Sequence, residues 1–240
     1  MNGGTKRMMY KSCIFDLDGT LVDTLDSLVF SVNTTLELMH LPNITREQCR
    51  QFVGNGSRIL LKKALQAAGS ELDSRIEEAV RIYEDVFEKH CLHNVTPYEG
   101  IPELLEALQR KGIQLAVLSN KPHKQTVRVV TTIFGEQTFS WIQGQQDDIP
   151  KKPDPSAAIW IANQIKSTPQ ETIYIGDSEV DIETGIRACM RTIGVSWGFR
   201  EKEFLRQIGA KYIADTPYDI LHQLEQLELE DSGGKCDESI

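Results

Sequence analysis

Short apolar runs alternate with helical patterns along most of this chain, and this alternation limits the possible folds more than any other feature. Strands that alternate with helices form right-handed βαβ units. The sequence therefore predicts an α/β protein with a Rossmann-like parallel sheet at its core. The predicted strands are KSCIFD, IQLAVLSN, FSWIQG, TIYIGD, RTIGVSW and a weaker AKYIAD, and the helical patterns between them include IPELLEALQRKG, KQTVRVVTTIFG, SAAIWIANQIKS and VDIETGIRACM.

Residues 22–94 follow a different pattern. They contain no clear strand run and are typical of consecutive helices, with breaks at Pro and Gly such as Gly54-Asn55-Gly56. A helical block that follows the first strand predicts a second, smaller domain. We therefore expect a core formed by residues 1–21 and 95–227 and a helical domain at 22–94, and the polar tail 228–240 is expected to be disordered.

Composition excludes several classes of partner. The net charge of −9 argues against nucleic-acid binding, which requires a basic face. There is no run of 18 apolar residues and no secretion signal, so we expect no membrane partner. The 5 cysteines are scattered without a CxxC pair, which favours reduced thiols in a cytoplasmic protein. The sequence leaves both a monomer and a homodimer open.

Polar side chains gather where the predicted strands end. Ligands of parallel α/β sheets bind beyond these carboxyl ends, so the residues there are candidates for a common site. Asp177 and Asp181 lie four positions apart at the start of a helix and are expected to be neighbours. The candidates at the strand ends are Asp16, Asp18, Ser119, Asn120, Lys152, Asp177 and Asp181.

This residue set suggests phosphoryl transfer through an aspartyl-phosphate, with Asp16 as the nucleophile. Two unit charges about 4 Å apart repel by roughly 4 kcal/mol at an effective dielectric near 20, so an attacking carboxylate and a phosphate need cations. Converging carboxyl groups suit Mg²⁺, which prefers oxygen ligands. Lys152 is the candidate for a further positive charge, whereas Lys121 is expected to be a surface lysine.

Asp18 is available for proton transfer. It would protonate the leaving oxygen and later activate the water that hydrolyses the acyl-phosphate. Backbone N–H groups can hold the phosphoryl oxygens together with catalytic Ser119. The predicted phosphate-binding residues are Leu17, Gly19, Thr20 and Asn120.

These motifs resemble those of the haloacid dehalogenase superfamily, in its phosphatase branch. The DxDGT motif is matched by DLDGT from Asp16, and the Ser that ends the second strand by Ser119. The KPxP lysine is matched by Lys152, and GDxxxD by GDSEVD with Asp177 and Asp181. All four motifs occur in the family's order, and the resemblance spans about residues 11–215.

The resemblance implies roles for individual residues. Asp16 is implied as nucleophile and Mg²⁺ ligand, and Asp18 as acid/base and metal ligand through its backbone carbonyl. Asp177 is implied as the third metal ligand, and Asp181 as a supporting acid. Thr20 is implied to orient Asp18. The helical block resembles a C1-type cap.

The substrate implied by the resemblance is a small phosphorylated metabolite. VGNGS, PYEGI and GVSWGFR together resemble phosphoglycolate phosphatases, which hydrolyse 2-phosphoglycolate. Gly54, Asn55 and Gly56 are expected to form a loop of the cap that faces the substrate. Ser57 is a candidate N-cap for the next helix, and Arg58 would add positive charge.

Other functions within and outside the superfamily remain open at this point. A phosphoglucomutase-like isomerase usually carries DGV rather than DGT, and a pyrophosphatase would share the same motifs. The dehalogenase branch lacks the acid that Asp18 supplies here. A non-catalytic binding protein on this fold is expected to lack at least one of Asp16, Asp18, Lys152 or Asp177, and all are present.

Overall fold

The computed structural model describes residues 10–70 and 72–233 of the chain. At its centre is a six-stranded sheet in the order β5-β4-β1-β6-β7-β8, in which every pairing is parallel. Each strand overlaps a run that the sequence singles out, so the predicted parallel sheet is confirmed. The strands are β1 (Ser12–Phe15), β4 (Gln114–Pro122), β5 (Trp141–Gln145), β6 (Thr172–Gly176), β7 (Arg191–Val195) and β8 (Tyr212–Ala214).

Helices cover both faces of the sheet because successive side chains of a strand point to opposite sides. Phe15 packs in one apolar cluster with residues of α5 (Ile101–Arg110), α6 (His123–Phe134) and α10 (Pro217–Gly233). Ile14 packs in a second cluster on the opposite face with α7 (Ser156–Gln164) and with Ala188, which follows α8 (Glu179–Arg187). The remaining elements of this part are a 3₁₀ turn at Pro169–Glu171 and α9 (Lys202–Gln207).

The disordered tail predicted from residue 228 is wrong for its first residues. Helix α10 continues to Gly233, because Ile220, Leu224 and Leu227 recur at helical spacing and are buried against the sheet layer. This helix was not predicted from the sequence. The rest of the tail, 234–240, lies outside the described residues.

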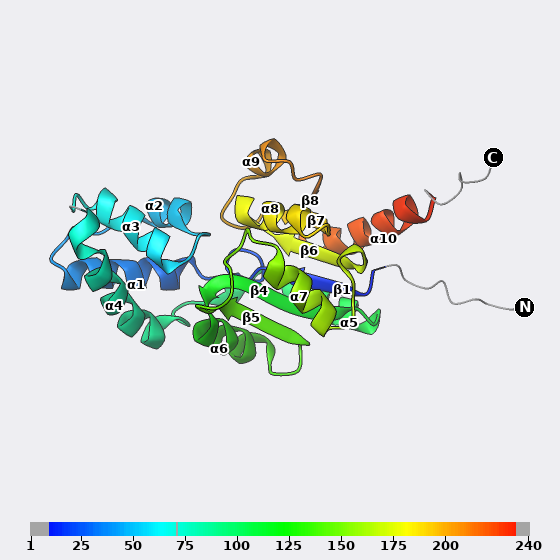
Figure 1. Cartoon of the computed structure of the whole chain (residues 1–240), viewed down its shortest axis with the longest axis horizontal. Helices are drawn as coiled ribbons and strands as arrows, with labels where there is room; N and C mark the ends of the chain where they lie inside the picture. Colours follow the sequence, from blue (N-terminus) through cyan, green and yellow to red (C-terminus); the bar gives the residue numbers. More distant parts are fainter. Residues whose placement is uncertain (1–9, 71, 234–240) are drawn as a thin grey trace, which may run out of the picture.

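The helical block consists of α1 to α4 and lies at one end of the molecule, with α10 at the opposite end (Figure 1). The chain enters and leaves it through a two-stranded antiparallel pair, β2 with β3. These strands lie next to the limits 22 and 94 that the sequence suggests. The bounds are β2 (Val22–Asp23), α1 (Leu25–Leu38), α2 (Arg46–Phe52), α3 (Ser57–Ala67), α4 (Leu72–His90) and β3 (Thr96–Pro97).

The order of the strands creates a switch point beside β1. From β1 the chain continues to β4 and β5 on one side of the sheet and then returns to β6 on the other side. The carboxyl ends of β4, β1 and β6 therefore lie together, next to the point where the chain enters the helical block. Among the residues that the structure describes, no helix is both long and apolar enough to cross a lipid bilayer.

Candidate active site

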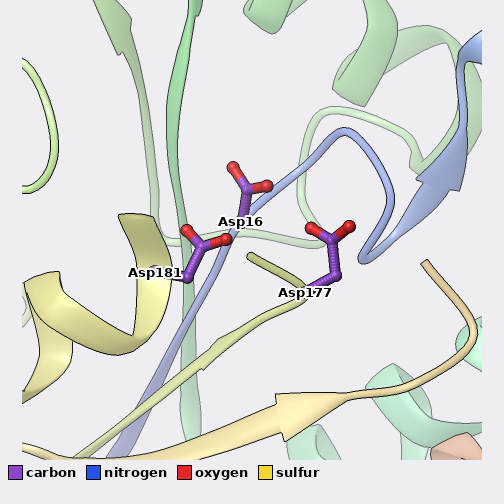
Figure 2. A group of neighbouring side chains, drawn as sticks. All are labelled: Asp16, Asp177 and Asp181. Atoms are coloured by element: carbon purple, nitrogen blue, oxygen red, sulfur yellow. The ribbon is translucent and has the colours of Figure 1, made fainter. Parts of the chain in front are cut away.

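Three buried carboxylates meet at the switch point. Asp16 follows β1, Asp177 follows β6, and Asp181 lies in the first turn of α8; their carboxylate oxygens lie within 4.8 Å of one another (Figure 2). Gly176 permits this approach, because a Cβ at that position would lie 2.3 Å from the side chain of Asp181. The strand ends thus bring together the acids that the sequence identifies as candidates.

Lys152 joins two of these carboxylates. Its Nζ donates to Asp16 Oδ1 and to Asp181 Oδ1, both at 2.7 Å. Burial by itself would lower the pKa of Lys152, but the charges of Asp16 and Asp181 outweigh it and raise that pKa well above its usual range. Lys152 is buried and its neighbour Lys151 is exposed, so the site lysine is Lys152.

The carboxylates themselves are shifted towards their protonated forms. Burial, followed by the charge of Asp181, raises the pKa of Asp16 to about 7. Burial and the charges of Asp181 and Asp16 raise the pKa of Asp177 well above its usual value. Lys152 pairs with two of the three acids of this cluster, so the cluster has more negative charge than Lys152 alone balances.

Asp181 also caps helix α8. Its Oδ2 accepts hydrogen bonds from the backbone N–H of Ser178 at 3.1 Å and from the Ser178 hydroxyl at 2.6 Å. Its Oδ1 faces Lys152. These two hydrogen bonds fix the orientation of the Asp181 carboxylate. The same side chain therefore holds the start of α8 and presents its other oxygen to Lys152.

Asp18 pairs with a lysine that was expected at the surface. Lys121 Nζ lies 2.8 Å from Asp18 Oδ1 and 3.1 Å from Oδ2, and only 2% of the lysine side chain is exposed. Strand β4 continues to Pro122, which places Lys121 two residues after Ser119 on the same face. That spacing was the signal in the sequence that the surface assignment overlooked.

The loop after β1 differs from expectation at Thr20 and Gly19. The Thr20 hydroxyl donates to Asp177 Oδ1 at 3.3 Å, so it supports Asp177 and not Asp18. The Gly19 N–H donates to Val22 O, and the Thr20 N–H to Leu17 O. Both amides are therefore used within the loop and do not serve as phosphate donors in this arrangement. The Leu17 N–H stays a predicted donor.

Ser119 and Asn120 lie at the end of β4. The Ser119 Oγ accepts from the Lys121 N–H at 3.3 Å. The Asn120 side chain accepts from the Lys152 N–H at 3.0 Å, and its amide lies 3.1 Å from both Lys152 O and Gly54 O. The expected phosphate-binding side chain of Asn120 thus holds the backbone of Lys152 and reaches the helical block.

The Gly54-Asn55-Gly56 segment approaches this site, as the sequence suggests for its glycines. Gly54 and Gly56 line the cleft described below, whereas Asn55 is absent from its lining. Arg58 does not face the cleft: it is exposed and pairs with Glu77 on α4, because both lie on the outer surface of the helical block. Helix α3 begins at Ser57, so its N-cap is Gly56.

Arg200 is a site residue that sequence reasoning missed. Its guanidinium donates to Glu179 in the core, at 2.8 and 3.2 Å, and to the carbonyls of Arg50 and Val53 at 3.1 and 2.9 Å. It therefore connects the core to the segment that leads to Gly54. Arg200 ends the GVSWGFR segment that contributes to the resemblance, but its partners are far away in the sequence, so the segment alone did not indicate this role.

A cleft lies between the helical block and the carboxyl ends of the strands. Its free volume is about 50 Å³. Charged and polar residues lie on the core side, and apolar residues of the helical block face them. The lining consists of Asp16, Asp18, Leu28, Val53, Gly54, Gly56, Ser57, Leu60, Tyr83, Phe87, Ser119, Asn120, Lys121, Pro122, Lys152, Asp177, Ser178, Phe199 and Arg200.

The fold and this site define a class of protein: an α/β protein whose parallel sheet carries a carboxylate at the end of its first strand and an acidic cluster beside it. The family profile described as haloacid dehalogenase-like hydrolase matches residues 13–195. The chain belongs to this family, which confirms the resemblance seen in its motifs.

The chain is similar to several curated phosphatases. A phosphoglycolate phosphatase of Aquifex aeolicus is 33% identical over 78% of this chain and 84% of its own length. An N-acetylmuramic acid 6-phosphate phosphatase of Pseudomonas aeruginosa is 30% identical over 92% and 97%. The crystal structure of a predicted phosphoglycolate phosphatase from Haemophilus somnus superposes with a TM-score of 0.83 at 28% identity, over 90% of this chain and 98% of that one. The enzyme class is thus phosphoric monoester hydrolase.

Proposed function

We propose that this protein is a Mg²⁺-dependent phosphatase of small phosphomonoesters, with 2-phosphoglycolate as the first candidate, that works through an aspartyl-phosphate on Asp16. One observation carries the proposal: Asp16, Asp177 and Lys152 of the buried acidic cluster line the same cleft as the paired Asp18, and Asp181 supports them from behind through Lys152. A cytoplasmic location and a monomeric or homodimeric state stay predictions.

The donor set of the cluster fits a divalent cation. All donors are carboxylate oxygens, which hard cations such as Mg²⁺ prefer, and their charge exceeds that of Lys152. Asp16, Asp177 and the backbone carbonyl of Asp18 would hold the ion, with Asp181 in support. When bound, Mg²⁺ would supply the positive charge that offsets the repulsion between Asp16 and a phosphate dianion.

The residues of the chain account for the remaining steps. A carboxylate oxygen of Asp16 attacks phosphorus while the bond to the leaving oxygen breaks, and Asp18 donates a proton to that oxygen. Asp18 then takes a proton from the water that attacks the aspartyl-phosphate, which releases phosphate and restores Asp16. Lys152 Nζ, held between Asp16 and Asp181, contributes positive charge beside the phosphoryl group.

We propose that the helical block acts as a cap over this cleft, with its Gly54 loop bonded to Asn120. The free volume of the cleft is about 50 Å³, whereas an engineered cavity that holds benzene measures about 150 Å³. 2-Phosphoglycolate has more non-hydrogen atoms than benzene, so the helical block must move away from the strand ends to admit even this small ester.

A phosphate-release panel tests the proposed function. With Mg²⁺, we expect kcat/KM for 2-phosphoglycolate to exceed that for N-acetylmuramic acid 6-phosphate, pyrophosphate and hexose phosphates. Conversion of hexose 1-phosphate to hexose 6-phosphate without release of phosphate would instead favour a mutase. No phosphate release from any ester, with Mg²⁺ present and the fold intact by circular dichroism, would contradict a phosphatase.

Mg²⁺ is expected to stabilise the folded protein, and more so at pH 8 than at pH 5.5. The pKa of Asp16 is raised to about 7 in the folded chain without metal, so the stability contributed by this group declines as pH rises from about 4 to 7. Mg²⁺ binds the ionised form and offsets that loss. Free Mg²⁺ at about 100 times its Kd adds about 2.7 kcal/mol, or roughly 5 to 10 °C in Tm.

Thermal melting of chelator-treated protein, with and without Mg²⁺ at both pH values, checks this stabilisation. The difference between paired melts isolates the cluster from other titrating groups. Ca²⁺ and K⁺ at matched ionic strength serve as controls for ion type and screening. An equal gain in Tm at both pH values would argue against metal binding at the ionised carboxylates.

A further inference from the structure

Lys121 is a buried cation in the cleft to which the proposed mechanism gives no task. It lies at the end of β4, and 2% of its side chain is exposed. Its Nζ pairs with Asp18 and lies 4.8 Å from the centre of the Phe87 ring on α4. Two elements of different parts of the chain therefore contribute to its environment.

Lys121 bonds to fewer residues than the other cations in the cleft. Lys152 lies between the carboxylates of Asp16 and Asp181. Arg200 pairs with Glu179 and also bonds to two carbonyls of the helical block. Lys121 has one carboxylate partner, Asp18, although an ammonium carries three N–H donors.

The position of Lys121 relates it to the leaving group. Asp18 must reach the leaving oxygen to protonate it, and Lys121 Nζ lies 2.8 Å from Asp18 Oδ1. Leu28, Tyr83 and Phe87 of the helical block also line the cleft, and they are buried and uncharged. Because these three residues carry no charge, an anionic group on the leaving alcohol would find its cation at Lys121.

We propose that Lys121 binds a carboxylate of the leaving group and so selects phosphate esters of 2-hydroxy acids. This proposal rests on the proposed phosphatase activity and names the substrate class of that same site. In such esters the carboxylate lies one carbon atom from the ester oxygen, so Asp18 at the oxygen and Lys121 at the carboxylate can act side by side. Once Asp18 has donated its proton, it and the carboxylate of the leaving group carry like charges, and Lys121 beside Asp18 offsets their repulsion.

A matched pair of substrates separates this role from general support of Asp18. 2-Phosphoglycolate and 2-hydroxyethyl phosphate differ in that the second carries a neutral hydroxymethyl group in place of the carboxylate. We expect the full-length protein with Mg²⁺ to prefer 2-phosphoglycolate in kcat/KM by roughly 10- to 100-fold, the discrimination that a hydrogen bond to a charged group supplies. In Lys121→Met that ratio should fall to about 1, while Lys121→Arg should keep most of it.

Lys124→Met is the control for the loss of one positive charge. Lys124 lies on α6, its side chain is 74% exposed, and it pairs with Glu88 on the surface. This variant should keep the wild-type ratio. Lys121→Gln is a second neutral variant in case the methionine protein does not fold, and thermal melting checks both.

Three results would overturn the proposal. Folded Lys121→Met or Lys121→Gln could lose kcat/KM for both esters equally, so that the ratio between the esters stays unchanged. That result would mean that Lys121 only supports Asp18. A wild-type protein that hydrolysed both esters equally would exclude a carboxylate subsite while leaving the phosphatase activity intact. A wild-type protein that hydrolysed neither ester, nor any other, would remove the proposed function and this subsite with it.

Discussion

Asp16→Asn is expected to lower kcat by at least about 10⁴-fold, which would be the largest effect of any single change in this site. The amide has nearly the same size as the carboxylate, but it cannot attack phosphorus to form an aspartyl-phosphate. Release of phosphate from 2-phosphoglycolate, or from the best substrate of the panel, measures the loss. Near wild-type turnover would mean that the covalent mechanism is wrong.

The Tm of Asp16→Asn distinguishes the loss of the nucleophile from the loss of the folded structure. Burial and the charge of Asp181 hold the pKa of Asp16 near 7, so at pH 8 without metal the neutral asparagine relieves repulsion inside the cluster. We therefore expect the Tm of Asp16→Asn in chelator at pH 8 to equal or exceed that of the wild type. A clear fall in Tm would leave the loss of activity attributable to unfolding.

Lys152→Met is expected to remove both activity and stability. A donor that stabilises transition-state charge contributes about 10²- to 10³-fold to kcat, so a fall of at least that size is expected. Removing the ammonium leaves Asp16 and Asp181 buried without their cation, which should lower the free energy of unfolding by about 3 to 5 kcal/mol. Initial rates and urea unfolding at pH 8 measure the two effects.

Lys151→Met and a double variant serve as controls for Lys152. Lys151 is adjacent in sequence but exposed, so its loss should change kcat only slightly. Adding Asp181→Asn to Lys152→Met removes one of the uncompensated charges and should restore part of the stability but not the activity. If Lys151→Met cost as much activity as Lys152→Met, the assignment of the site lysine would be wrong.

Much of the core could be predicted because its signals are local. Buried parallel strands appear as short apolar runs, and each run in the sequence corresponds to a strand of the sheet. The pair β2 and β3 was not predicted, because two-residue strands show no periodicity. Helix α10 was missed because its polar end concealed the buried spacing of Ile220, Leu224 and Leu227.

The residues of the candidate site also fall into two groups, those with a local signal in the sequence and those without one. Asp16 and Asp177 follow strands directly, and parallel strand ends converge wherever such a sheet forms, so their proximity followed from the pattern. Lys121 was assigned to the surface because a lysine is rarely buried unless it is paired, and its partner could not be identified from the sequence. Arg58 was placed near the substrate for its charge, yet Glu77 holds it on the outside.

The sequence by itself determined the type of sheet, the helical block that follows the first strand, and the acids and the lysine at the strand ends. These features depend on the spacing of apolar residues along the chain and on the polar residues that directly follow each apolar run. Only the tertiary structure decided which polar groups pair: Lys121 with Asp18 across 103 positions, and Thr20 with Asp177 across 157. The physical reason is that hydrogen bonds and ion pairs form only within about 3 to 4 Å, and packing alone sets that separation for residues so far apart in the chain.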